Sequence, residues 1–297
     1  MKTVFNILIG IMVVWILWVC VFRKSADKEN TVHAGSQSES FEGIRNVKTC
    51  ANCFNRPVSV AYDSDTYALY VSCLNDVSSD LPYSGYVCKT DLYGDIADTL
   101  KVPELRSPNG LAVKGPHLYI TDLNRVIRFN ISTDSVDLVY RVPGAMFLSD
   151  IVCDKRGVMY ASDRHAGCVY RLQGDSAVVF CRDTICDNIT GLCISGTQLV
   201  GGCKNRIVAF SANGQASVVA NVPYSVYGIK SDDNDGFLVS DYVGNIHYVA
   251  DGKTKVLSKR HGDANSADFE YIPGQQMIYM PTYKSNSLEL YQVGGRL

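Results

Sequence analysis

The sequence predicts an all-β protein built as a six-bladed β-propeller, preceded by one membrane-spanning segment at the N-terminus. Two observations predict the propeller. Glycine and tyrosine are plentiful, with 24 and 18 residues among 297, and amphipathic helical spacing is scarce, a balance typical of short strands joined by turns. In addition, a pattern of two apolar runs separated by a turn recurs about every 40 residues, which is the sequence signature of a propeller.

The repeats can be aligned on one equivalent position near the start of each first strand. Six copies align, with spacings of 51, 40, 41, 37 and 40 residues. The aligned positions are Ser59, Gly110, Asp150, Gly191, Gly228 and Asp268. The first interval is long because residues 74–85, LNDVSSDLPYSG, insert a turn-rich loop between the second and third strands of that unit.

The second copy indicates how each unit is built. We expect a short inner strand at 111–113, an alternating strand at 117–121, a third strand at 126–130 and an outer strand at 136–141. The turn after the second strand carries an acidic residue in several copies: Asp122, Asp163 and Asp241. A carboxylate at a turn can accept hydrogen bonds from backbone N–H groups, so we predict a structural role for these aspartates rather than a catalytic one.

The last copy is too short to complete a unit by itself. Only 29 residues follow Asp268, enough for three strands but not for an outer fourth. We predict that residues 43–48, GIRNVK, supply the missing strand, so that the propeller domain, residues 43–297, closes by pairing its start with its end. Such closure hides an otherwise exposed sheet edge.

The N-terminus differs in kind from the repeats. Residues 4–22 carry no charge over 19 positions, and at about 1.5 Å per residue this run nearly spans a hydrocarbon core of about 30 Å. No signal-peptide cleavage site follows, because basic residues come at once. We therefore predict an uncleaved anchor over residues 1–24, a polar linker over 25–42, and the domain on the exported side, periplasmic or extracellular.

Composition and motifs exclude several partners and mechanisms. The formal net charge is only −2, so the chain lacks the basic footprint of a nucleic-acid-binding protein. No Gly-x-Ser-x-Gly motif occurs, and the five histidines form no spaced metal pair, which argues against a serine or zinc mechanism. The partners that we expect are the membrane, through residues 4–22, and an unknown small molecule or protein at the channel face of the propeller.

Several stretches of the chain resemble one known family. They are PNGLAV, LYITD, RVPGAMFLSDIVCDKRGVMYASD, GFLVSDYVGNIHYV and NSADFEYIPGQQMIYMPTYKSNSLELY. These are similar to the gluconolactonase and senescence-marker-protein (regucalcin-like) family of six-bladed propellers, over about residues 43–293, and especially to its exported bacterial members. The resemblance implies hydrolysis of sugar lactones at a divalent cation, held in the central channel by a Glu, two Asn and an Asp.

The four ligand positions implied by this resemblance carry the wrong side chains here. They fall at Val58, Ser149, Thr190 and Tyr227. A hard cation such as calcium is held by several oxygens with carboxylates among them, and none of these residues offers one. Asn109 keeps the family's Asn-Gly-Leu form but belongs to the second blade, outside the ligand set. The sequence therefore predicts no calcium-type site and no cofactor.

Two acidic residues leave a rebuilt metal site open. Asp150 and Asp268 come from the third and sixth copies, which face each other across a six-bladed ring. A cation bridging them could take further oxygens from Asn109, Ser149 and Thr190. The other interpretation is that each carboxylate caps the start of its strand. The binding candidates at the channel mouth are therefore Asn109, Ser149, Asp150, Thr190, Tyr227 and Asp268.

The sequence leaves two classes of function open. In the first, a membrane-tethered propeller with a degenerate metal site binds a ligand or a protein without turnover. In the second, the chain is a metal-dependent, lactonase-like hydrolase with a rebuilt site, so whether it is an enzyme stays undecided. We favour the first, because the fold persists where the catalytic ligands do not, and a fold alone does not establish chemistry.

The eleven cysteines allow disulfides in an exported domain, since ten remain when Cys20 is set aside. We predict a pair between Cys73 and Cys88, because the 74–85 insertion leaves them in adjacent strands of one unit. Cys20 lies where a bacterial lipoprotein cysteine would lie, but no small residue precedes it, so its lipidation stays open.

Overall fold

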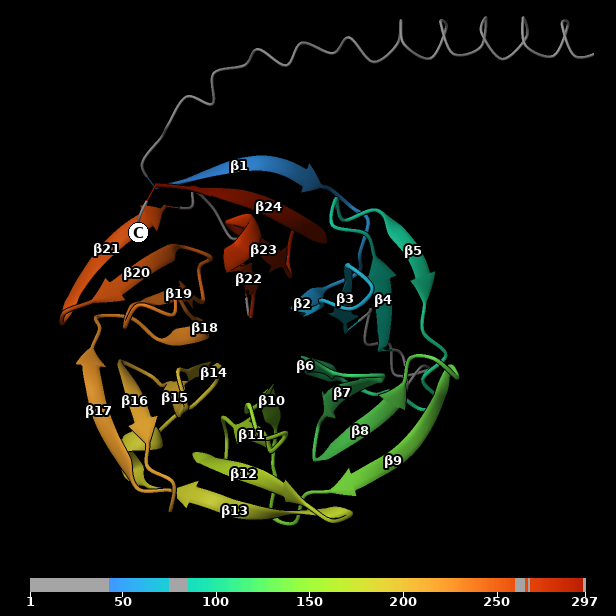
Figure 1. Ribbon diagram of the computed structural model, residues 1–297, viewed down its shortest axis with the longest axis horizontal. Coiled ribbons are helices and arrows are strands. Elements are labelled where there is room, and N and C mark those ends of the chain that lie inside the picture. Colours follow the sequence, from blue (N-terminus) through green and yellow to red (C-terminus); the bar gives the residue numbers. More distant parts are fainter. Residues whose placement is uncertain (1–42, 75–84, 260–264, 267, 296–297) are drawn as a thin grey trace, which may run out of the picture. The chain divides into compact units, whose positions relative to one another are not determined.

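The computed structural model describes residues 43–74, 85–259, 265–266 and 268–295. These residues form an all-β propeller of 24 strands arranged around a central axis, with two short 3₁₀ helices (Figure 1). No helix among them is long and apolar enough to cross a membrane. The predicted anchor and linker, residues 1–24 and 25–42, lie outside the described residues, so both stay predictions.

The strands form four four-stranded sheets and one eight-stranded sheet. Three of the four-stranded sheets each begin with the strand nearest the axis and continue outwards with antiparallel neighbours (Figure 1). The first holds β2 (Pro57–Asp63), β3 (Ala68–Cys73), β4 (Tyr86–Thr90) and β5 (Ile96–Thr99). The second holds β14 (Leu192–Ser195), β15 (Gln198–Gly202), β16 (Arg206–Phe210) and β17 (Ala216–Asn221). The third holds β18 (Val226–Ser231), β19 (Phe237–Asp241), β20 (Ile246–Ala250) and β21 (Lys253–Ser258).

The eight-stranded sheet joins two runs of the same pattern. One run is β6 (Pro108–Lys114), β7 (His117–Asp122), β8 (Arg125–Asn130) and β9 (Ser135–Arg141), which confirms the four strands predicted for the second copy. The other is β10 (Leu148–Cys153), β11 (Met159–Asp163), β12 (Cys168–Gln173) and β13 (Ser176–Arg182). The two runs meet through a single parallel pair, Ser176 with Arg141.

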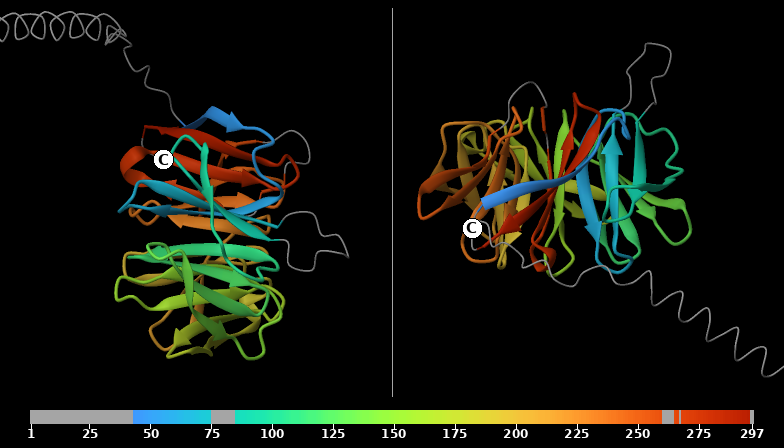
Figure 2. Two further views of the ribbon diagram at one scale, coloured as in Figure 1. Left: turned by 90° about the vertical axis from the view of Figure 1, so that its right-hand side faces the viewer. Right: turned by 90° about the horizontal axis from the view of Figure 1, so that it is seen from above.

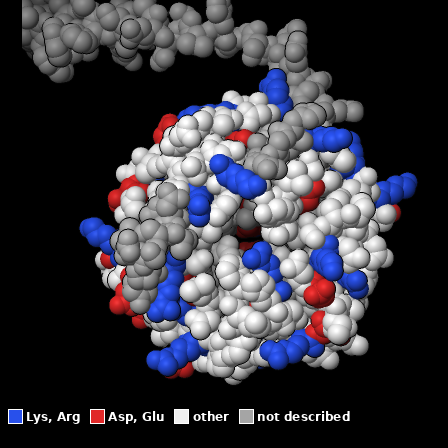
Figure 3. All heavy atoms as spheres, turned by 180° about the vertical axis from the view of Figure 1, so that it is seen from behind, with Lys and Arg blue, Asp and Glu red and all other residues white. Residues whose placement is uncertain are grey.

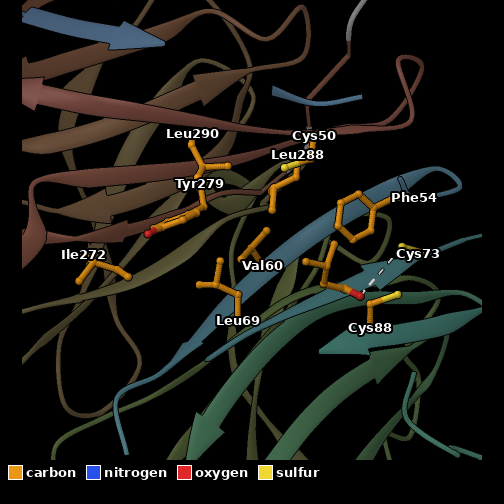
Figure 4. Close-up of a cluster of buried hydrophobic side chains, with 11 residues drawn as sticks. Cys50, Phe54, Val60, Leu69, Cys73, Cys88, Ile272, Tyr279, Leu288 and Leu290 are labelled. Carbon is orange, nitrogen blue, oxygen red and sulfur yellow. Dashed lines mark hydrogen bonds between the residues drawn. The ribbon is translucent and has the colours of Figure 1, made fainter. Parts of the chain in front are cut away.

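The remaining sheet closes the ring with both ends of the domain. It is ordered β1 (Gly43–Cys50), β24 (Ser287–Gly294), β23 (Met277–Thr282) and β22 (Glu270–Ile272), with β1 outermost (Figure 2). The antiparallel pairing of β1 with β24 confirms that residues 43–48 supply the outer strand of the last unit. A buried cluster that includes Phe54, Val60 and Leu288 fills the junction with the first sheet (Figure 4).

The recurring turn aspartates hold the connections between strands. Asp122 and Asp163 each accept two backbone N–H groups from the segment that leads into the inner strand of their own sheet run, at 2.6 to 3.1 Å. Asp241 accepts two N–H groups from its own turn, both at 3.0 Å. These bonds support the structural role predicted for all three carboxylates.

Glycines occupy three of the six aligned positions, and at two of them the backbone of the next inner strand approaches closely. A Cβ atom on Gly110 would lie 2.4 Å from Asp150 Cα, and one on Gly191 would lie 2.7 Å from the carbonyl oxygen of Tyr227. Both opposing atoms belong to the backbone of the next inner strand, which cannot rotate away as a side chain can. Contact between neighbouring strands therefore explains the glycines at positions 110 and 191 of the aligned set.

We expect Gly110→Ala to lower the free energy of unfolding by about 3 kcal/mol or more, since overpacking typically costs about 1–3 kcal/mol even where side chains can adjust. Gly274→Ala is the matched control, because no atom lies within 4 Å of its added Cβ and the change should stay within about 0.5 kcal/mol. Urea unfolding of both variants measures the difference. Equal stabilities would contradict the close strand approach.

Candidate functional site

The inner strands β2, β6, β10, β14, β18 and β22 surround a channel that contains charged side chains. Figure 3 shows a hollow at the centre of the ring, with acidic atoms inside it and basic side chains beside it. The charged residues that interact there are Asp150 in β10, Lys230 in β18, Glu270 in β22 and Asp268, two residues before Glu270. Sequence reasoning found the two aspartates but missed Lys230 and Glu270.

Asp268 joins three neighbouring inner strands. Its Oδ1 lies 3.3 Å from Lys230 Nζ, and its Oδ2 accepts a hydrogen bond from Ser59 Oγ at 2.9 Å. The Asp268 side chain is 8% exposed and that of Lys230 is 19% exposed, so water screens this ion pair only partly. Lys230 therefore supplies the positive charge that the buried Asp268 carboxylate needs.

Asp150 is satisfied by the backbone of two strands. Its Oδ1 accepts the N–H of Ile151, and its Oδ2 accepts the N–H of Leu192 in β14, both at 2.7 Å. The carboxylate thereby links β10 to β14. This geometry supports the interpretation of Asp150 as a strand-capping residue, which the sequence had left open beside the metal-binding one.

Burial and the neighbouring charges both shift the pKa values of the residues in this cluster. Burial, followed by the charge of Asp268, raises the pKa of Asp150 from 3.8 to about 8, although Lys230 and the two N–H donors oppose the change. Burial lowers the pKa of Lys230, but the nearby carboxylates, Asp268 above all, outweigh it and raise that pKa overall. Burial also raises the pKa of Glu270. At neutral pH the Lys230 ammonium is thus charged, while burial favours the protonated form of Asp150.

Side-chain polar contacts link each sheet or run to the next around the whole ring. Besides the bonds of Asp150 and Asp268, they include Ser72 Oγ to the Asn109 carbonyl, Asn109 Nδ2 to the Leu148 carbonyl, Ser231 Oγ to Ser195 Oγ, and the Tyr62 N–H to Glu270 Oε2. Asn109 therefore bridges the strands around it. Much of the polar character of the channel serves to hold neighbouring inner strands together.

The other predicted site residues lie apart from the charged cluster. Ser149 is buried, and its Oγ has no hydrogen-bond partner among the described residues. Thr190 Oγ1 donates to the carbonyl of Asn188 at 3.1 Å. The ring of Tyr227 lies against that of Tyr242, with centroids 5.1 Å apart. Of the six candidates, the structure brings together Asp150 and Asp268, near enough for one charge to raise the pKa of the other.

These residues do not fit a hard divalent cation. Val58 is buried and apolar, both Asp150 oxygens accept backbone N–H groups, and Asp268 already faces the Lys230 ammonium. Across the part of the chain that the structure describes, no group of three or more His, Cys, Asp or Glu side chains is arranged to hold a metal ion. A cation between the two aspartates would meet Lys230 as a like charge.

A cavity of about 310 Å³ lies along the inner strands and is lined in part by two members of this cluster, Lys230 and Glu270. Its lining includes the side chains two positions after each aligned residue: Ala61, Ala112, Val152, Cys193, Lys230 and Glu270. Because side chains alternate along a strand, residues at i and i+2 share one side. Taking the residue two positions after each aligned residue would therefore have identified Lys230 and Glu270. The lining does not include Asn109, Ser149, Thr190 or Tyr227.

Cys73 and Cys88 lie in the adjacent strands β3 and β4, as predicted, and both are buried free thiols (Figure 4). In the strand register Cys73 is opposite Tyr86 while Cys88 is opposite Val71, so the two cysteines are diagonal neighbours. Their thiols nevertheless interact directly, because a side-chain hydrogen bond between them contributes to raising the pKa of Cys73 and lowers the pKa of Cys88. The disulfide between them stays a prediction.

No family model and no curated protein matches the chain. Several solved structures share its fold. A gluconolactonase from Xanthomonas campestris is 17% identical, with 88% of this chain and 99% of that chain covered and a TM-score of 0.66. A putative gluconolactonase is 16% identical over 88% and 95%, with a TM-score of 0.63. Virginiamycin B lyase from Staphylococcus aureus is 13% identical over 84% and 99%, with a TM-score of 0.61. The chain therefore has a gluconolactonase-like β-propeller fold, as the sequence resemblance implied.

Proposed function

We propose that this chain is a membrane-tethered, six-bladed propeller that binds a small polar molecule in its channel without turning it over. Dividing the eight-stranded sheet at its single parallel pair gives six units, in agreement with the six sequence copies. The observation that carries the proposal is the ion pair of Lys230 with Asp268, which gives this carboxylate a cation of the protein's own beside an open cavity.

The cavity has the chemistry of a small-molecule site. Its volume is at the lower end of the range of about 300–1,000 Å³ that ligand pockets occupy. Tyr62 and Tyr271 supply aromatic surface, Lys230 supplies hydrogen-bond donors, and apolar inner-strand residues form much of the remaining wall. This combination suits a compact molecule with several hydrogen-bonding groups and one apolar face.

The tether in this proposal is the uncharged run over residues 4–22, with the propeller on the exported side. The support is the length of that run and the basic residues that follow it without a cleavage site. Protease added to intact spheroplasts should digest the propeller. Full protection would reverse the orientation.

The alternative is a metal-dependent, lactonase-like hydrolase with a rebuilt site, favoured by the meeting of Asp150 and Asp268 in the channel. Full-length protein in detergent, assayed with gluconolactone and calcium, magnesium, manganese or zinc, separates the two. We expect hydrolysis at the protein-free rate and no rise in melting temperature with calcium, because the expected ligand positions lack carboxylates. Metal-dependent hydrolysis that disappears in Asp268→Ala would contradict the proposal and support the alternative.

Binding in the cavity can be tested by ligand-observed NMR with a library of small polar molecules. Ser231→Trp places a bulky side chain at the cavity wall, whereas Ser132→Trp places the same side chain on an exposed turn between β8 and β9. We expect binding signals that survive in Ser132→Trp and vanish in Ser231→Trp. A library whose signals respond equally to both substitutions would count against this cavity as the site.

A further inference from the structure

Cys181 and Cys186 form a second, unpredicted pair of thiols. Cys181 is near the end of β13, Cys186 is the last residue of η1 (Thr184–Cys186), and their Sγ atoms are 3.9 Å apart. Both side chains are buried. The turn between them is already ordered, because the Asp183 carboxylate accepts the N–H of Ile185 at 3.0 Å and caps η1.

The sulfurs need only a small movement to bond. A disulfide has an S–S distance of about 2.0 Å, so the gap must close by about 2 Å, which is within the reach of a change in one side-chain torsion. Two further thiols lie nearby: the charge of Cys203 contributes to raising the pKa of Cys186, and that of Cys168 contributes to raising the pKa of Cys181. The sulfurs of Cys181 and Cys186 are within hydrogen-bonding distance of each other, which makes this the favoured pair.

We propose that Cys181 and Cys186 form a structural disulfide when the domain folds under oxidising conditions. One thiolate attacks a low-molecular-weight disulfide such as oxidised glutathione, forming a mixed disulfide and releasing one small thiol. The second thiolate then attacks the mixed disulfide and releases the other small thiol. Two protein thiols are oxidised, one small disulfide is reduced, and the two protons lost by the protein thiols are taken up by the two small thiols released.

The disulfide forms before the residues around Cys181 and Cys186 are fully packed. Burial raises the pKa of both Cys181 and Cys186, so few thiolates exist in the folded state, and thiolate is the reacting species. The bond would fix the connection from β13 to β14, which carries Thr190 to the start of its inner strand. In the cell, this inference depends on the exported position proposed above; in the test tube it does not.

Tryptic peptides make the bond directly measurable, because trypsin cleaves after Arg182, between the two cysteines. The expected product joins residues 172–182 to residues 183–204. Full-length protein refolded with reduced and oxidised glutathione, then alkylated and digested, should give this linked pair, with fragmentation assigning the bond to Cys186 rather than to Cys193 or Cys203. The link should persist in Cys203→Ser and disappear in Cys186→Ser.

The oxidised protein should also melt about 4 to 8 °C above the same protein kept reduced, as expected for closing a short loop in a domain of this size. The comparison is made in Cys73→Ser, so that a bond between Cys73 and Cys88 does not contribute to the shift. Free Cys181 and Cys186 after refolding, or a link from either to Cys168 or Cys203, would overturn the pairing. If the pair links on refolding but is fully alkylated in protein taken from cells, the exported orientation is contradicted and the pairing is supported.

Discussion

Replacing Lys230 by methionine is expected to lower the free energy of unfolding at neutral pH by about 3–5 kcal/mol, because removal of one partner leaves a buried charge uncompensated. Methionine keeps the length and apolar stem of lysine, so the loss reports mainly the ammonium. Asp268 would then retain its bond from Ser59 but would face no cation. Urea unfolding at constant ionic strength measures the change.

The matched control is the double variant Lys230→Met with Asp268→Asn. An asparagine can still accept the Ser59 hydrogen bond and carries no charge that needs compensation, so this variant should regain a large part of the stability lost by Lys230→Met alone. If the double variant were less stable than Lys230→Met by the full cost of a second independent lesion, the ion pair would not be the source of the effect.

The second large effect that we expect is a change in the stability of the protein with pH. The pKa of Asp150 is about 8 in the folded state, above its ordinary value of 3.8, so folding favours the protonated form. The contribution of this group to stability is therefore fully present below about pH 4 and is lost progressively as the pH rises towards 8. A tenfold difference in acidity between the folded and unfolded states corresponds to about 1.4 kcal/mol, so the loss should amount to several kcal/mol.

Asp150→Asn should remove this pH dependence, since an amide cannot ionise. We expect the stability of Asp150→Asn relative to the unchanged protein to rise between about pH 5 and about pH 9, measured by urea unfolding at each pH. Asp251→Asn, in an exposed turn, is the control and should follow the unchanged protein. Parallel curves for Asp150→Asn and the unchanged protein would contradict the raised pKa of Asp150.

Much of this fold could be predicted from the sequence, because the strands and turns of each repeat depend on residues that are close together in the chain. The period near 40 residues located the strands, the shortened last copy indicated that residues 43–48 must close the ring, and the turn aspartates indicated their own hydrogen bonds. Asp150 and Asp268 were found for the same reason, since they occupy aligned positions. The bridge from Ser176 to Arg141 was not predictable, because it depends on how closely two outer strands approach.

The channel chemistry was harder to predict because it depends on distances across the ring. In the sequence, Lys230 is a single charged residue within an inner strand. Its partner, Asp268, comes 38 positions later in another part of the ring. No pattern among neighbouring residues in the sequence predicts which carboxylate a lysine ammonium will face. The proximity of Cys181 and Cys186 likewise depends on the path of η1, which the strand repeat does not describe.

The closing sheet also determines where mechanical force would enter the propeller. Any tension transmitted from a membrane anchor through the preceding chain reaches the domain at Gly43, the first residue of β1 and the partner of Gly294 in β24. The backbone hydrogen bonds between these two strands would therefore bear tension before any other sheet does. Their rupture would uncover the edge of β24 and open the ring, so the proposed tether would couple membrane tension to the integrity of the channel.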